Sequence, residues 1–367
     1  MSGLSRGLSR RLVLGSAVAL AACEGGAKSQ PALAPPLLKS LKDSAAFPVG
    51  TCVQVSHLDQ PLWVQLARAQ CSQLTPEWEM KMEYILQPDG TYRFDRPDRI
   101  AAFAKANGQR LYCTTLVWYA QKPDAFVNLD ESRVSFASAF DNYITTVVGR
   151  YRGQAVGWDV VNEAVAEDGE GWRQSLWADK LGDFDHMRRA FDLAKAADPE
   201  AVLFINDYNL ESLPKKFDTF QRLVERLLKA GAPVGGLGCQ SHLAADLPGG
   251  AMTRTLQALA RFGLPIHVSE LDVSLSRVER RFAPRAELER GQAALYAETA
   301  EAFAGLPEAQ RFALTLWGLR DKDSWLRGEN AADAPAPFND DGWPKEAAHA
   351  LADGLSGGLY GNAKPRR

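Results

Sequence analysis

The chain has 367 residues, of which 46% are hydrophobic and 24% are charged, so it can bury a sizeable core. Its formal net charge is −3 and it contains no long basic run, which argues against nucleic acid as a partner. The five cysteines and five histidines show no close ligand spacing, which disfavours a zinc site, a redox motif and metal-dependent hydrolysis.

The residue types of the N-terminal segment follow one another as in an export signal. Arginines precede an uncharged, mostly apolar run over residues 12–22, which is too short to span a bilayer. Residues 9–11 (Ser-Arg-Arg) resemble a twin-arginine signal, and residues 20–23 (Leu-Ala-Ala-Cys) resemble a bacterial lipobox, whose cysteine carries lipid. We expect a signal peptide over residues 1–22 and a lipid on Cys23. An ordinary cleavage site with an incidental cysteine is the alternative.

Residues 23–45 contain Gly, Pro, Ala and Ser with little periodicity, which predicts a flexible tether with a short helix near Leu37 to Lys42. The expected location of the protein is outside the cytoplasm of a bacterium: the periplasm, the outer membrane through the lipid, or the medium. Contact with a membrane is expected only through Cys23, and the protein is expected to be a monomer.

Apolar runs alternate with amphipathic stretches through the body, residues 46–360. The runs are nearly continuous in apolar residues, as in strands buried on both faces of a parallel sheet. The predicted strands are 48–55, 71–75, 110–118, 155–162, 201–207, 236–243, 265–272 and 312–319. The predicted helices are 97–107, 133–152, 184–197, 216–230, 251–262 and 285–304, and glycines that can end helices are Gly108, Gly153, Gly231, Gly263 and Gly305.

This alternation predicts an α/β fold, a single (β/α)₈ TIM barrel, followed by a short tail over residues 361–367. The body contains four cysteines, Cys52, Cys71, Cys113 and Cys239, all in apolar stretches. They are expected to be small buried hydrophobic residues, although a disulfide such as Cys52–Cys71 is possible in an exported protein.

Polar residues gather where the predicted strands end, which is the face of such a barrel that carries chemistry. The fourth strand ends in Asn162-Glu163 and the seventh contains Glu270 and Asp272. Polar groups at the ends of apolar strands are costly to bury unless they face a cleft or pair with one another. A lone glutamate at such a place is more often a helix N-terminal or salt-bridge residue, so the argument rests on the convergence of several.

Two carboxylates on opposite sides of one cleft can hydrolyse a glycosidic bond. One protonates the leaving oxygen and the other attacks the anomeric carbon, which retains configuration when the carboxyl groups lie roughly 5–5.5 Å apart. Glu163 and Glu270 stand at the ends of the fourth and seventh strands, which lie nearly opposite in an eight-stranded barrel, so both side chains can point into one central cleft. The charge of the nucleophile raises the pKa of the acid, and its loss in the covalent intermediate lets the same residue act as base.

The chain resembles glycoside hydrolase family 10, the xylanase family, over about residues 74–345. The matching segments, in order, are Leu74-Thr75-Pro76-Glu77 with Met80-Lys81, Thr115-Leu116-Val117-Trp118, Trp158-Asp159-Val160-Val161-Asn162-Glu163, Asn206-Asp207-Tyr208-Asn209, Gln240-Ser241-His242, Ser269-Glu270-Leu271-Asp272, and Trp317-Gly318 with Asp321-Lys322-Asp323-Ser324-Trp325.

The resemblance implies that Glu163 is the acid/base, that Glu270 is the nucleophile, and that no metal or organic cofactor is needed. It implies that Asn162 binds the sugar 2-hydroxyl and that His242, linked to Asp272, holds Glu270. The other implied site residues are Gln240 beside this network, Glu77 and Lys81 on the non-reducing side, the walls Trp118, Trp317 and Trp325, and Tyr208 and Asn209 on the leaving-group side.

Three positions depart from the family pattern. Trp78 replaces the usual Asn, Tyr119 replaces a His that contacts the central sugar, and Thr114 replaces a second His. A Trp side chain offers one donor, whereas Asn offers both donors and an acceptor. We therefore expect altered sugar recognition on the non-reducing side.

The expected function is that of an endo-1,4-β-xylanase acting on a polysaccharide or oligosaccharide. One alternative keeps the mechanism but changes the substrate to another β-glycan or an aryl β-glycoside. The other is a weakly active surface protein that binds glycans.

Overall fold

The computed structural model describes residues 36–132 and 134–357. The predicted signal peptide, Cys23, most of the predicted tether and the tail over 361–367 lie outside these residues. The described end of the tether contains a short helix, α1 (Leu41–Ser44). Leu41 is fully buried, and its backbone N–H donates to Oε1 of Gln70 at 2.9 Å, so this end packs against the body of the protein.

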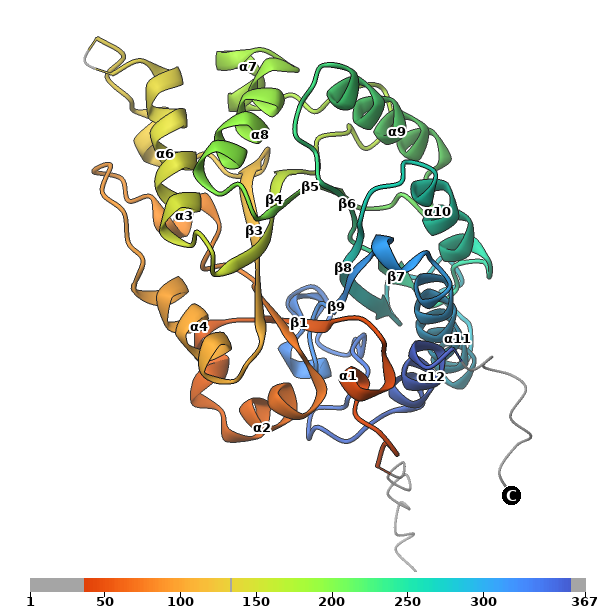
Figure 1. The fold of residues 1–367 in the computed structure, drawn as a ribbon. Coiled ribbons are helices and arrows are strands. Elements are labelled where there is room, and N and C mark those ends of the chain that lie inside the picture. The colour runs from red at the N-terminus through yellow and green to blue at the C-terminus, as the bar shows by residue number, and fades with distance from the viewer. Residues whose placement is uncertain (1–35, 133, 358–367) are drawn as a thin grey trace, which may run out of the picture. The chain divides into compact units, whose positions relative to one another are not determined.

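In the described part of the chain, eight of the nine parallel strands close into a barrel, with the first strand, β1, beside the last, β9 (Figure 1). Pairing of β6 with β8 completes the ring, which confirms the predicted (β/α)₈ architecture. The barrel strands are β1 (Val49–Val53), β2 (Gln73–Pro76), β3 (Arg110–Trp118), β4 (Ala155–Asn162), β5 (Val202–Asp207), β6 (Gly236–Cys239), β8 (Ile266–Ser274) and β9 (Arg311–Leu316).

Helices surround the barrel on the outside (Figure 1). Each of the longer ones buries apolar residues, and the periodicity of the sequence predicts six of them. They are α2 (Pro61–Gln70), α4 (Asp95–Ala106), α6 (Phe136–Arg150), α8 (Asp185–Ala197), α9 (Pro214–Lys229), α10 (Ala251–Ala260), α11 (Arg285–Ala304) and α12 (Glu346–Leu355). Shorter helices are α3 (Met82–Ile85), α5 (Asp124–Val127), α7 (Leu176–Leu181), η1 (Val55–Asp59), η2 (Glu308–Gln310), η3 (Asp321–Asp323) and η4 (Trp325–Gly328).

One local prediction needs correction. The run predicted as one strand over 236–243 is broken into β6 and the short β7 (His242–Ala244), because Ser241 has a left-handed backbone with φ of 63°. Gly305 is the C-cap of α11, as predicted, and its φ of −75° means that it lacks the left-handed turn seen at the other four predicted glycines. The four cysteines of the body are buried and free, so no disulfide joins Cys52 to Cys71.

The barrel interior below the site is filled by aromatic rings. The ring centroids of Tyr112 and His267 are 4.3 Å apart, and those of Phe204 and Phe312 are 4.7 Å apart. These residues come from β3, β5, β8 and β9, so the interior is a packed core and not a pore. Gly236 leaves room for one of these rings, since a Cβ there would lie 2.2 Å from Phe204 Cε1.

We predict that Gly236→Ala destabilises the fold. The added methyl group forces the Phe204 ring to move in a packed interior, at a cost of about 1–3 kcal/mol in the free energy of unfolding. Gly149→Ala is the matched control, because a Cβ at this exposed position in α6 meets no atom within 4 Å. The control should stabilise the helix by roughly 0.5–1 kcal/mol. Urea denaturation of both variants tests this, and equal stability of the two would contradict the packing described.

Candidate active site

A cleft of about 360 Å³ lies at the C-terminal ends of the barrel strands. It brings together most of the side chains that the sequence predicts for the site, from strands β2 to β9 and the loops after them. Its lining consists of Glu77, Trp78, Lys81, Thr114, Trp118, Asn162, Glu163, Tyr208, Asn209, Gln240, His242, Glu270, Arg277, Trp317 and Trp325.

Glu163 follows β4 and is only 8% exposed. Its Oε2 accepts a hydrogen bond from Trp118 Nε1 at 2.8 Å, and its Oε1 accepts one from Gln240 Nε2 at 2.9 Å. Burial raises the pKa of this carboxyl, the two hydrogen bonds oppose the shift, and the nearby carboxylates of Asp207 and Glu270 add to it. The balance favours a carboxylic acid that still holds its proton above the usual range for Glu.

Glu270 lies within β8 and has partners that suit a carboxylate. Its Oε1 accepts a hydrogen bond from Asn206 Nδ2 at 3.0 Å, and His242 Nε2 lies 3.4 Å from its Oε2. The other ring nitrogen of His242, Nδ1, lies 3.0 Å from Asp272 Oδ1. Burial alone would lower the pKa of His242, but the two carboxylates outweigh it and raise that pKa to about 10. The ring is therefore an imidazolium, which compensates the negative charge of Glu270.

A chain of side-chain amides connects the two glutamates. Gln240 Nε2 donates to both Glu163 and Asn162 Oδ1, the latter at 3.3 Å. Asn206 Nδ2 donates to Asn162 Oδ1 at 3.0 Å as well as to Glu270. Because Ser269 Oγ donates to Asn206 Oδ1 at 2.9 Å, the orientation of this amide is fixed. The chain therefore holds the two carboxyl groups in one arrangement across β4, β5, β6 and β8.

One end of the cleft is formed by Glu77, Trp78 and Lys81. Lys81 is 8% exposed, and its Nζ lies 4.2 Å from the Trp78 ring centroid and 4.7 Å from that of Trp118. Burial lowers the pKa of Lys81. Burial also raises the pKa of Glu77 to about 7, against the hydrogen bond that Gln54 Nε2 donates to it at 3.0 Å. Trp78 thus covers the ammonium group with an aromatic face.

The other end continues into a second cavity of about 530 Å³. Asn209, His242 and Arg277 line both cavities, so the second one extends the cleft beyond Tyr208 and Asn209. The guanidinium of Arg277 lies over the Trp325 ring, 4.5 Å from its centroid.

Two predicted site residues do not line the first cavity, although one of them, Asp272, lines the second. Asp272 accepts a hydrogen bond from Trp325 Nε1 at 3.0 Å on one oxygen and contacts His242 with the other. Tyr119 lines a small neighbouring cavity, and its ring lies 4.3 Å from the guanidinium carbon of Arg173.

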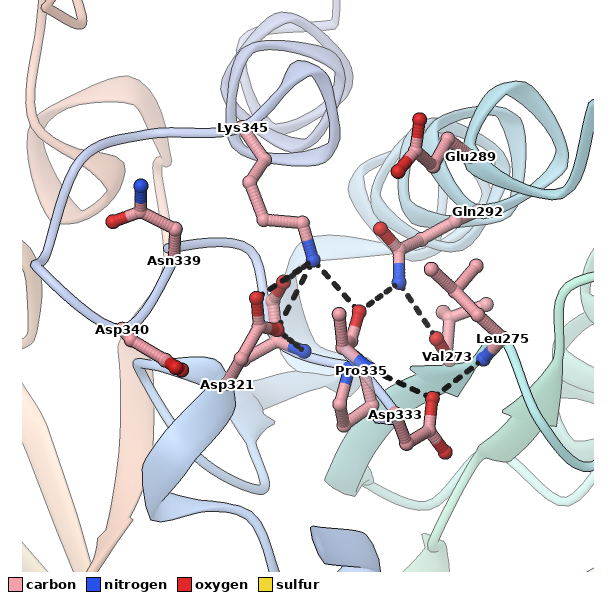
Figure 2. A network of polar contacts seen from close by, with 12 residues as sticks. Val273, Leu275, Glu289, Gln292, Asp321, Asp333, Pro335, Asn339, Asp340 and Lys345 are labelled. Atoms are coloured by element: carbon pink, nitrogen blue, oxygen red, sulfur yellow. Dashed lines mark hydrogen bonds and ion pairs between the residues drawn. The ribbon is translucent and has the colours of Figure 1, made fainter. Parts of the chain in front are cut away.

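The loop that carries Trp325 is anchored by a buried polar network (Figure 2). Lys345 Nζ donates to Asp321 Oδ1 at 3.1 Å and to the carbonyl oxygens of Ala334 and Ala336, each at 2.7 Å. Gln292 of α11 donates to the carbonyl oxygen of Ala334 at 2.8 Å. The loop is thereby tied to the outer helices, so the Trp325 wall has a fixed support.

Three strand ends share an unusual backbone. Glu163, Asn209 and Ser241 have φ of 56°, 56° and 63°, and among the described residues they are the non-glycine residues with positive φ. Such conformations cost about 1–3 kcal/mol each and collect at functional sites. They occur where β4, β5 and β6 turn away from the barrel, and each belongs to a segment that faces the cleft.

Sequence reasoning missed three residues that support the site. Asn206 stood in a matching segment, but its link to Glu270 depends on the pairing of β4, β5 and β8. Arg277 and Arg173 lie in loops, where no periodicity indicates the direction of a side chain. Within the described residues, no group of three His, Cys, Asp or Glu side chains is arranged to hold a metal ion.

The sequence model of glycosyl hydrolase family 10 matches residues 38–354. The chain belongs to this family. Endo-1,4-β-xylanase A of Cellvibrio japonicus is 33% identical over 86% of this chain and 56% of its own length. Endo-1,4-β-xylanase A of a Caldicellulosiruptor species is 33% identical over 84% of this chain and 46% of its own length. The chain thus spans about half the length of these curated relatives.

A solved structure shows the same fold. It is that of a mutant xylanase A from P. fluorescens subsp. cellulosa in complex with xylopentaose. The identity is 31%, the TM-score is 0.80, and the match covers 87% of this chain and 100% of that one. The family membership and the eight-stranded barrel are therefore supported by sequence and by structure.

Proposed function

We propose that the protein is an endo-1,4-β-xylanase that hydrolyses internal linkages with retention of configuration. The observation that carries the proposal is the pair of buried glutamates facing one cleft in different electrostatic settings. Glu163 has a raised pKa, whereas Glu270 lies beside the imidazolium of His242. Two carboxyl groups held in opposite protonation states are what a double displacement needs. The likeness to xylanases supports xylan as the substrate.

In the first step, a carboxylate oxygen of Glu270 forms a bond to the anomeric carbon while the glycosidic bond breaks. Glu163 transfers its proton to the departing oxygen, and the leaving chain diffuses away. In the second step, water attacks the anomeric carbon and gives its proton to Glu163, which now acts as base. The bond to Glu270 breaks, and both carboxyl groups return to their starting states.

The cleft provides binding surfaces that suit an uncharged sugar chain. The rings of Trp118, Trp317 and Trp325 line it together with the amides of Asn162 and Gln240. Flat rings contact sugar faces, and the amides are held in one orientation by the chain described above. The mechanism uses only side chains of this protein and needs no cofactor.

A second candidate keeps this mechanism and changes the glycan. The observation that favours it is Trp78, which lines the cleft and covers Lys81 where the family pattern has Asn. An indole cannot replace both the donor and the acceptor of an amide. Sugar recognition on the non-reducing side would then favour a different β-glycan or an aryl β-glycoside over plain xylan.

We also propose that the protein is exported and carries lipid on Cys23. The support is the sequence of residues 1–23, and among the described residues no helix is both long and apolar enough to cross a membrane. Cys23→Ser should release the protein from the membrane fraction of a bacterial host into the soluble fraction. Equal partition of the unaltered protein and the variant would contradict lipid anchoring.

Glu270→Gln should abolish hydrolysis of β-1,4-xylo-oligosaccharides, because the amide cannot form the glycosyl intermediate. Glu163→Gln should lower kcat/KM by about 10²–10⁴-fold, the usual contribution of a general acid. The matched control is Glu200→Gln, which should leave the rate unchanged, because this exposed glutamate precedes the start of β5 whereas the cleft residues Tyr208 and Asn209 follow the end of that strand. The measurement resolves products by length and anomer, with gluco-oligosaccharides alongside. Binding without cleavage by the unaltered protein would favour the glycan-binding alternative.

The basic limb of the pH profile of kcat/KM should follow ionisation of Glu163. Trp118→Phe removes a hydrogen bond that stabilises the ionised carboxylate, so the pKa of Glu163 should rise further. The basic limb should then move to higher pH by roughly one pH unit, since a hydrogen bond to a charged group contributes about 1.5 kcal/mol. Trp343→Phe, at an indole 44% exposed, is the control. A limb that stays in place would contradict the assignment.

Trp78→Asn tests the second candidate. If Trp78 blocks recognition of plain xylan, the variant should gain roughly tenfold in kcat/KM on unbranched xylo-oligosaccharides, the equivalent of about one hydrogen bond. Trp343→Asn serves as the control for loss of an indole away from the cleft. A fall in kcat/KM on xylo-oligosaccharides would mean instead that Trp78 binds the sugar.

A further inference from the structure

Arg173 lies behind the cleft wall, between β4 and α7, and its side chain is 14% exposed. The segment that leads to it folds back on itself through an antiparallel bridge between Val165 and Trp172. The backbone N–H of Arg173 donates to the carbonyl oxygen of Ala164 at 2.7 Å. Arg173 is thereby held next to the residue that follows Glu163, although it stands ten positions later in the chain.

The guanidinium is bonded to the backbone of Glu163. Its Nε donates to the carbonyl oxygen of Glu163 at 3.0 Å. Glu163 is one of the left-handed residues, and its own N–H donates to the carbonyl oxygen of Asn206 at 2.8 Å. The backbone of this strained residue is therefore fixed at both of its polar groups, by strand β5 on one side and by Arg173 on the other.

The other nitrogen of the fork reaches the leaving-group side. Arg173 Nη2 donates to the hydroxyl of Tyr208 at 2.6 Å and to Glu167 Oε2 at 3.1 Å. Its guanidinium carbon lies 4.3 Å from the ring centroid of Tyr119. Glu167 also contacts the fully buried Lys216, at 3.1 Å, and Lys216 pairs with Asp207 at the same distance. Arg173 therefore belongs to a charge-balanced network of two cations and two carboxylates.

We propose that Arg173 is a positioning residue for the proton transfer by Glu163. This inference rests on the proposed function. Arg173 holds the Glu163 peptide in the left-handed conformation from which the carboxyl points into the cleft, and it fixes that peptide relative to Tyr208. The role requires a guanidinium, because one flat group presents separate donors along fixed directions while its face packs on a ring. The single ammonium of a lysine cannot meet the same set of partners.

The proposal predicts for which substrates kcat/KM falls when Arg173 is changed. Departure of a sugar alkoxide or a phenolate of high pKa needs the proton of Glu163, whereas 2,4-dinitrophenolate leaves without one. The value of kcat/KM reports the steps up to the first departure of the leaving group. Displacement of the Glu163 carboxyl should therefore slow the hydrolysis of substrates with poor leaving groups selectively. Attack by Glu270 should be unaffected.

The experiment compares kcat/KM for phenyl and 2,4-dinitrophenyl β-xylobiosides. Arg173→Gln should lower the value for the phenyl substrate by about 10- to 100-fold and that for the dinitrophenyl substrate by less than about threefold. Arg173→Lys should show the same selectivity, although it keeps the charge. Arg188→Gln is the matched control, since Arg188 forms only a surface pair with Asp192 at 3.6 Å. It should leave both values unchanged.

An equal fall for both substrates in the two variants would overturn the proposal, since a general structural defect slows attack by Glu270 as well. Activity of the lysine variant equal to that of the unaltered protein would also overturn it, because charge alone would then suffice. If the unaltered protein hydrolyses neither xyloside, the proposed function fails and this inference fails with it. Thermal melting of each variant separates loss of fold from loss of positioning.

Discussion

The site depends on how two buried carboxyl groups are kept in different charge states at one end of an apolar barrel. Isolated charges in such surroundings are costly, so each group needs its own compensation. Glu270 has the imidazolium of His242, which Asp272 supports from behind. Glu163 has neutral donors, Trp118 and Gln240, and its pKa is raised. The difference between the neighbours thus assigns the acid and the nucleophile.

The amide chain between the glutamates makes this difference possible at close range. Asn162 and Asn206 belong to β4 and β5, Gln240 directly follows β6, and each amide contacts at least one of the others. Uncharged groups of this kind satisfy carboxylate oxygens without adding a positive charge that would lower the pKa of Glu163. Two of the left-handed residues, Glu163 and Ser241, directly follow Asn162 and Gln240, and the third, Asn209, stands three positions after Asn206. Backbone strain and amide packing therefore belong to one arrangement.

Support for the cleft comes from outside it, in two different ways. On the β9 side, Lys345, Asp321 and Gln292 fasten the loop that carries Trp325 (Figure 2). On the β4 side, Arg173 donates a hydrogen bond directly to the carbonyl oxygen of Glu163. The first anchor holds a wall against which a sugar can pack, whereas the second acts on the position of a reacting group. Substitutions at the two anchors should accordingly affect binding and chemistry to different degrees.

Much of this arrangement could be predicted from the sequence, because strands buried on both faces leave continuous apolar runs. All eight barrel strands were predicted within a few residues, and the polar residues after them identified the cleft. Helices α2 and α12 were not predicted. The first buries only Trp63, Leu66 and Ala67, and half of the residues that the second buries are alanines, so few large apolar side chains indicate either helix. The position of Tyr119 behind the wall and the contacts of Arg173 depend on loop folding, which no local pattern encodes.

The central claim is that Glu270 forms a covalent bond to the sugar, and trapping that intermediate tests it most directly. A 2,4-dinitrophenyl 2-deoxy-2-fluoro-β-xylobioside suits the purpose, because the fluorine slows both steps while the activated leaving group keeps the first one fast. Mass spectrometry of the intact protein and of its peptides should then show one fluoroxylobiosyl group, carried by Glu270. A label on another residue, or steady turnover with inverted configuration and no label, would contradict the account.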